Sequence, residues 1–137
     1  MNTLQQPRIF DASALVELCA GHPEVMDILF KARAGKLTLS LPALAVAEAQ
    51  AALRFSDHVW QHIFGFSGLT EQPLTWNGAL AAGVIAAPRL EHYPMQPALI
   101  GPIMVGQVVH EAREMKAIVV TRVPEAYGAY NVTLHHI

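Results

Sequence analysis

The alternation of short apolar segments with helix-forming segments constrains the fold of this chain more than any other feature. Each apolar segment is a few residues long and is followed by apolar residues at helical spacing. The sequence predicts strands at residues 8–10, 37–42, 73–76, 117–121 and 131–137, helices at residues 12–20, 22–36, 42–55, 57–68, 77–87 and 102–116, and a proline-rich loop at residues 88–97. Strands that alternate with helices form a parallel sheet covered on both faces. We therefore expect an α/β fold, a three-layer α/β/α sandwich around a central, mostly parallel sheet, in a single domain over residues 1–137.

The composition limits the class of protein. The chain has 137 residues and is 53% hydrophobic, which is a high apolar content for a chain without a membrane span. This excess predicts either a buried interface with another chain or simply an alanine-rich core, and both interpretations stand at this point. The formal net charge of −2 gives no general attraction to nucleic acid.

The sequence also bears on where the protein works. No apolar stretch reaches the roughly 18 to 20 residues of a membrane span. Residues 1–8 lack the charged and apolar regions of a signal peptide. Cys19 is the only cysteine, so the chain has no internal disulfide, as is usual in the cytosol. We expect a cytoplasmic protein that does not associate with membranes.

Polar side chains stand where two of the predicted strands end. Asp11 follows the strand at residues 8–10, and Thr121 ends the strand at residues 117–121. Binding sites in parallel α/β sheets form at the carboxyl ends of strands, so both side chains are candidates for one crevice. Ser13 lies two residues beyond Asp11. A buried aspartate needs partners, so Asp11 is either the cap of the following helix or the first residue of a site.

A second carboxylate lies within the helix predicted at residues 42–55. Glu48 has only leucine and alanine as neighbours at helical spacing, namely Leu44, Ala45, Ala51 and Ala52. A carboxylate on such an apolar face either reaches water at the edge of the face or serves a site.

Three segments together resemble the PIN-domain family, the fold of many small ribonucleases that include the VapC toxins of bacterial toxin–antitoxin pairs. These segments are "FDASALVEL", "LPALAVAEAQAAL" and "HEAREMKAIVVTR". The resemblance implies an endoribonuclease that depends on Mg²⁺ or Mn²⁺, whose carboxylates hold the cation that activates water. On this resemblance Asp11 and Glu48 are the expected metal ligands, and Ser13 and Thr121 are expected to orient water or phosphate beside them.

The chain departs from the family pattern at two acidic positions. The third acid of the family falls on Val105 and the fourth on Val123, and neither side chain binds a cation. Glu91, in the predicted loop, is the best candidate for a replacement. Losing two charged ligands costs several kcal/mol of cation binding at reduced dielectric. We therefore expect weak or lost ribonuclease activity.

The alternative is a non-catalytic PIN-like module that binds RNA or a protein partner such as an antitoxin. In either case the resemblance and the apolar composition lead us to expect a homodimer.

Overall fold

A computed structural model describes residues 6–92 and 98–137 of the chain, except the side chains of residues 91 and 92. Its core is a sheet of five parallel strands in the order β3-β2-β1-β4-β5. The strands are β1 (Arg8–Phe10), β2 (Leu39–Pro42), β3 (Leu69–Gln72), β4 (Ile118–Thr121) and β5 (Thr133–His136). The expected parallel sheet is confirmed.

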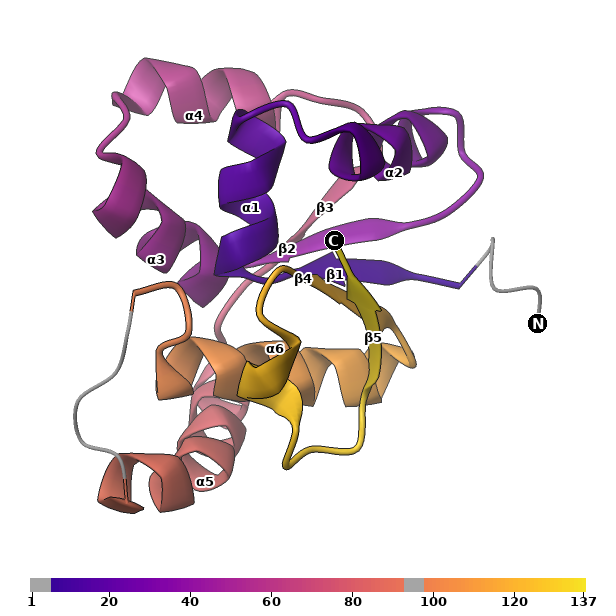
Figure 1. The fold of residues 1–137 in the computed structure, drawn as a ribbon. Coiled ribbons are helices and arrows are strands. Elements are labelled where there is room, and N and C mark those ends of the chain that lie inside the picture. Colours follow the sequence, from indigo (N-terminus) through magenta and orange to yellow (C-terminus); the bar gives the residue numbers. More distant parts are fainter. Residues whose placement is uncertain (1–5, 93–97) are drawn as a thin grey trace.

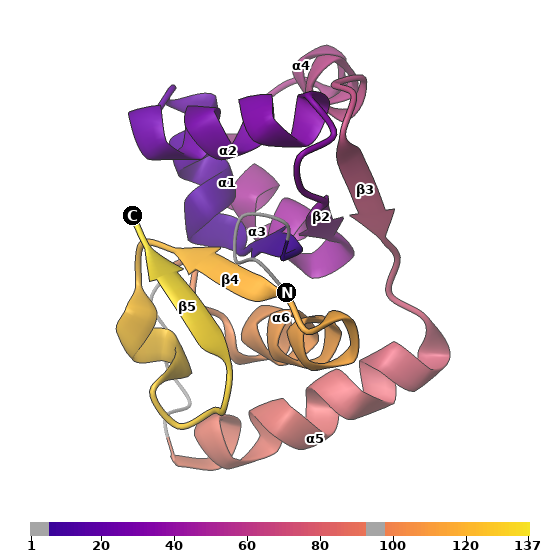
Figure 2. The same cartoon turned by 90° about the vertical axis from the view of Figure 1, so that its right-hand side faces the viewer.

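Helices cover the sheet on both sides. They are α1 (Ala12–Cys19), α2 (Pro23–Arg33), α3 (Ala43–Leu53), α4 (Asp57–Phe64), α5 (Trp76–His92) and α6 (Pro102–Met115), with a short 3₁₀ helix η1 (Pro124–Tyr127) after β4. In Figures 1 and 2, α1, α2 and α4 lie on one side of the sheet and α5 and α6 on the other. Helix α3 contacts both α1 and α6. The architecture is the predicted three-layer α/β/α sandwich.

The order of the strands places a possible site between β1 and β4. The chain runs from β1 outward through β2 to β3, and then returns to add β4 and β5 on the other side of β1. The carboxyl ends of β1 and β4 therefore flank the point where the direction of winding reverses, which is where ligands bind in open parallel sheets. Asp11 and Thr121 lie at these two strand ends, as expected.

Two sequence-based assignments are wrong. The strand predicted at residues 73–76 is instead β3 at Leu69–Gln72. Pro73 has no N–H to donate to a sheet, so the strand ends before it. Helix α5 does not stop before Pro88 but continues through it to His92. Proline has a φ angle compatible with a helix, but inside one it removes a hydrogen bond and crowds a carbonyl at a cost of about 3 kcal/mol, and the 17-residue helix α5 contains it nonetheless.

The buried core consists mainly of aliphatic side chains from the strands and from the inner faces of the helices. Within residues 6–92 and 98–137, no helix is long and apolar enough to cross a membrane.

Candidate functional site

Asp11 is both the cap of α1 and the centre of a buried polar network. Its side chain is fully buried, and its Oδ1 accepts a hydrogen bond from the Ala14 backbone N–H at 2.9 Å. The same oxygen accepts a second hydrogen bond from Ser13 Oγ at 2.6 Å. The two roles considered for Asp11 from sequence are therefore compatible, because the capping carboxylate also lies at the predicted strand-end crevice.

The other oxygen of Asp11 is bonded to a tyrosine that sequence reasoning missed. The Tyr127 hydroxyl donates to Asp11 Oδ2 at 2.8 Å, and Tyr127 is only 1% exposed. Burial, together with the negative charge of Asp11, raises the pKa of Tyr127 well above its usual value, so the phenol keeps its proton and acts as the donor. A buried tyrosine generally has a hydrogen-bond partner, but nothing in the spacing of the sequence indicates which one.

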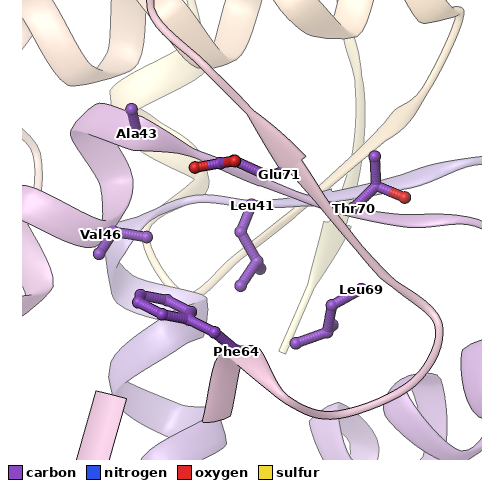
Figure 3. Close-up of a pocket in the computed structure, with 7 residues that line it drawn as sticks. All are labelled: Leu41, Ala43, Val46, Phe64, Leu69, Thr70 and Glu71. Atoms are coloured by element: carbon purple, nitrogen blue, oxygen red, sulfur yellow. The ribbon is translucent and has the colours of Figure 1, made fainter. Parts of the chain in front are cut away.

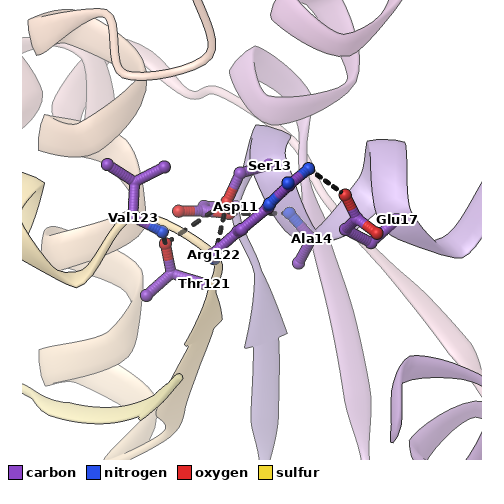
Figure 4. A network of polar contacts seen from close by, with 7 residues as sticks. All are labelled: Asp11, Ser13, Ala14, Glu17, Thr121, Arg122 and Val123. Carbon is purple, nitrogen blue, oxygen red and sulfur yellow. Dashed lines mark hydrogen bonds and ion pairs between the residues drawn. The ribbon is translucent and has the colours of Figure 1, made fainter. Parts of the chain in front are cut away.

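Ser13 and Thr121 complete the network (Figure 4). Their oxygens lie 3.3 Å apart, and Ser13 donates its own proton to Asp11. Backbone N–H groups donate to both hydroxyls, from Arg122 to Ser13 Oγ and from Val123 to Thr121 Oγ1, each at 2.9 Å. The three predicted residues from β1, α1 and β4 do lie together, and the protein itself supplies their partners.

The balance of forces on Asp11 follows from these contacts. Burial raises the pKa of its carboxyl group, and hydrogen bonds from Ser13, Thr121, Ala14 and Tyr127 partly oppose that rise. The carboxylate is thus kept in an apolar region by donors that stabilise its charge.

Glu48 lies near this network but is held by different partners. Its Oε1 accepts a hydrogen bond from the Gly101 backbone N–H at 3.1 Å, whereas its Oε2 is buried and has no hydrogen-bond partner. Burial raises the pKa of Glu48. The Gly101 hydrogen bond opposes this, the charge of Asp11 adds to it, and Arg89 opposes it. A Cβ atom at residue 101 would lie 2.6 Å from Glu48 Oε1, so glycine permits this close approach.

The two valines at the acidic positions of the family pattern lie in apolar surroundings. Val105 is fully buried in α6, and Val123 is partly buried against the core. Neither provides an oxygen. The side chain of Glu91, the candidate replacement, lies outside the described residues. Among the side chains that the structure describes, no group of three or more His, Cys, Asp or Glu residues could hold a metal ion.

These observations test whether the site fits a divalent cation. Mg²⁺ and Mn²⁺ require oxygen atoms with free lone pairs directed at one point. Both oxygens of Asp11 already accept hydrogen bonds from Ser13, Ala14 and Tyr127. Among the side chains that the structure describes, Glu48 Oε2 is the one carboxylate oxygen that is buried without a partner. As arranged, the residues do not fit such a cation. The metal-binding roles of Asp11 and Glu48 stay predictions.

A separate apolar groove lies beside the edge strand β3. It has a volume of about 380 Å³ and is bounded by residues from β2, α3, α4 and β3 (Figure 3). Its lining residues are Leu41, Ala43, Val46, Phe64, Leu69, Thr70 and Glu71. Phe64 is 43% exposed, so the groove presents an accessible aromatic ring.

Comparisons with known proteins bear on the fold. No family model matches the sequence, and no curated protein does. Among solved structures, VapBC2 from Rickettsia felis bound to a promoter DNA fragment is similar at a TM-score of 0.66 and 16% identity, over 95% of this chain and 98% of that chain. DNA-bound VapBC from Salmonella typhimurium is similar at a TM-score of 0.66 and 14% identity, over 96% of this chain and 98% of that chain. FitAcB from Neisseria gonorrhoeae is similar at a TM-score of 0.59 and 17% identity, over 94% of this chain and 96% of that chain. At these identities the similarity establishes the fold, which is the PIN-domain fold of VapC-type and FitB-type toxins.

Proposed function

We propose that this chain is a toxin-like PIN-fold module that binds a protein partner of the antitoxin kind and does not use a divalent cation for catalysis. The observation that carries the proposal is the hydrogen bond from Tyr127 to Asp11 Oδ2, at 2.8 Å. It gives the central carboxylate a donor from inside the protein on Oδ2, whereas Ser13 and Ala14 donate to Oδ1.

The contacts of Asp11 support the absence of a metal centre. Ser13, Ala14 and Tyr127 occupy three of the roughly four lone-pair positions of the Asp11 carboxylate, which leaves a cation at most one of them. In a metal-dependent nuclease several carboxylates hold the metal. Here Val105 and Val123 contribute none.

The proposed partner is supported by the neighbours of the fold and by the surface. The similar structures include a toxin–antitoxin complex from Klebsiella pneumoniae as well as VapBC complexes. The groove beside β3 combines apolar walls with Glu71, which suits an apolar side chain of a partner next to a basic one. The net charge of −2 does not favour RNA as the partner.

A second candidate is a weak Mg²⁺- or Mn²⁺-dependent endoribonuclease. The unpartnered Oε2 of Glu48, within electrostatic range of Asp11, favours it. Asp11 and Glu48 would then hold the cation when RNA phosphate supplies further oxygens, and Ser13 and Thr121 would bind water or phosphate.

RNA cleavage during a Mn²⁺ titration separates the two candidates. Wild-type protein and Asp11→Asn should be compared on the same RNA, because asparagine preserves the size of the side chain and removes its charge. We expect no Mn²⁺-dependent cleavage by either protein. Cleavage by the wild type that rises with Mn²⁺ and disappears in Asp11→Asn would establish the enzyme.

The partner is tested by coexpression with the product of an adjacent small reading frame, followed by size-exclusion chromatography. A stable complex that Leu69→Glu in the groove abolishes would support the proposal. The matched control, Val59→Glu, replaces an apolar residue of α4 that is 37% exposed and does not line the groove. If the coexpressed protein binds Leu69→Glu and Val59→Glu equally, this groove is not its binding site.

A further inference from the structure

Arg89 is a charged residue on the inner face of helix α5. This face is otherwise made of small residues, since Gly78, Ala82 and Ala86 are all buried. A Cβ atom at Gly106 of α6 would lie 2.4 Å from the Ala82 carbonyl oxygen, so the face packs closely against α6 (Figure 2). Arg89 follows Ala82 by seven residues, which is about two turns of helix, and therefore lies on the same face.

The guanidinium of Arg89 carries a buried donor that nothing satisfies. Its Nη1 is buried and has no hydrogen-bond partner. Within residues 6–92 and 98–137, Arg89 takes part in no ion pair. A buried charged donor without an acceptor loses its hydration and gains nothing in return, so it needs an explanation.

A carboxylate oxygen on another helix is in the same condition. Among the described side chains, the buried nitrogen and oxygen atoms without a partner are His22 Nδ1, Glu48 Oε2 and Arg89 Nη1. His22 precedes α2, which lies on the other side of the sheet from α5 (Figure 1). Glu48 and Arg89 remain, and they carry opposite charges.

Arg89 also lies near the carboxylate site. It lines a hollow of about 470 Å³ together with Glu125 of η1, the short helix that contains Tyr127. Burial raises the pKa of Glu48 and that of Tyr127, and the positive charge of Arg89 opposes both rises. The guanidinium is therefore within electrostatic range of both groups.

The other carboxylates near Arg89 are poorer partners for a buried donor. Asp11 already accepts three hydrogen bonds, and Glu125 is exposed, so water can solvate it. Glu48 Oε2 is the buried acceptor that is left. An arginine has a long flexible stem and five N–H donors, which suit it to reach a carboxylate and bind it.

We infer that Arg89 pairs with Glu48 through Oε2 and thereby weakens the attraction of the carboxylate site for a divalent cation. The chain then supplies from α5 a positive charge that a metal would otherwise supply. The inference deepens the proposed absence of a metal centre, because it adds a repelling charge to the loss of acids at Val105 and Val123.

A double-mutant cycle tests the pair. Urea denaturation should compare the wild type, Arg89→Met, Glu48→Gln and the double variant, since methionine keeps the apolar stem and glutamine keeps the size. We expect each single change to raise the unfolding constant at least about 10-fold, because it leaves the other charge buried and unpaired. Arg89→Met made in the Glu48→Gln background should raise it less than about 3-fold.

The control cycle pairs Glu48→Gln with Arg33→Met. Arg33 is exposed at the end of α2, on the other side of the sheet, so its effect should be the same in both backgrounds. Effects of Arg89→Met and Glu48→Gln that simply multiply would overturn the inference, and so would coupling of Arg89→Met to Glu125→Gln in their place. Arg89→Gln provides the same comparison if Arg89→Met does not fold.

Manganese tests the effect of the charge. In 1 mM MnCl₂ the unfolding constant of Arg89→Met should fall about 10-fold, which corresponds to a dissociation constant of about 0.1 mM, and that of the wild type less than about 2-fold. Arg89→Lys keeps the charge and should behave as the wild type does. Equal stabilisation of the wild type and Arg89→Met would overturn the inference. Strong stabilisation of the wild type, with a still larger effect in Arg89→Met, would instead refute the proposed function and leave the pair standing.

Discussion

Replacing Tyr127 by phenylalanine tests the network around Asp11 by removing a single hydroxyl group. The change removes the hydroxyl that donates to Asp11 Oδ2 at 2.8 Å and keeps the buried ring. The carboxylate then loses one donor in a site that water does not reach. Because hydrogen bonds to charged groups contribute about 1.5–3 kcal/mol, we expect the free energy of unfolding to fall by about that amount at neutral pH.

The same variant has a characteristic pH dependence. Burial raises the pKa of Asp11 in the folded protein, and the hydrogen bond from Tyr127 opposes that rise. Without the Tyr127 hydrogen bond, the pKa of Asp11 in the folded protein rises further. A raised carboxyl pKa makes folding less favourable as pH rises from the unfolded value through the folded one. The loss in Tyr127→Phe should therefore be larger at pH 7 than at pH 4.

Tyr130 provides the matched control for this experiment. Its hydroxyl donates to the Ile85 carbonyl at 3.3 Å, which is a neutral acceptor. Tyr130→Phe should cost about 0.5–1.5 kcal/mol and show no such change with pH. Urea denaturation followed by circular dichroism, at one protein concentration for all variants, measures both effects. If Tyr127→Phe and Tyr130→Phe lose the same stability at both pH values, Tyr127 does not stabilise a carboxylate at Asp11.

Three further predictions follow from other contacts. Gly101→Ala would place a methyl group 2.6 Å from Glu48 Oε1, so the Glu48 side chain must rotate away. Thermal denaturation should then show that the free energy of unfolding falls by about 1 kcal/mol. The control Gly83→Ala, which has nothing within 4 Å of the new methyl group, should instead stabilise α5 by up to about 1 kcal/mol. Val105→Asp buries a charge in α6 and should destabilise the protein by about 3–5 kcal/mol in EDTA; partial recovery in Mn²⁺ would mean that residue 105 faces the other two carboxylates. Removing metal with EDTA should leave the melting temperature of the wild type unchanged, and a fall of several degrees would mean that the folded protein holds a cation.

Much of the fold was accessible from the sequence because local patterns determine it. Buried strands such as β4 are short apolar runs, and parallel pairing follows from the helices between them. The two errors occurred at prolines, because Pro73 follows the end of a strand whereas Pro88 lies inside a long helix, and the residue type alone does not distinguish these positions. The proximity of Asp11 and Thr121 followed from topology alone.

The partners of the carboxylates were less predictable. Tyr127 lies 116 residues from Asp11, in a 3₁₀ turn after β4, and Gly101 lies 53 residues from Glu48. Such contacts depend on how helices pack, which residue spacing does not reveal. The exposed face of α5 is a similar case. The apolar excess of the composition suggested an interface or an alanine-rich core, and the structure has both the small buried side chains and the exposed large ones.

Calorimetric titration of the wild type with Mn²⁺, with Asp11→Asn as the control, tests most directly whether the carboxylate site has lost its cation. We predict no binding tighter than about 1 mM in either protein, because the oxygens of Asp11 are already bonded within the fold. Stoichiometric binding tighter than about 100 μM in the wild type, abolished in Asp11→Asn, would contradict the account.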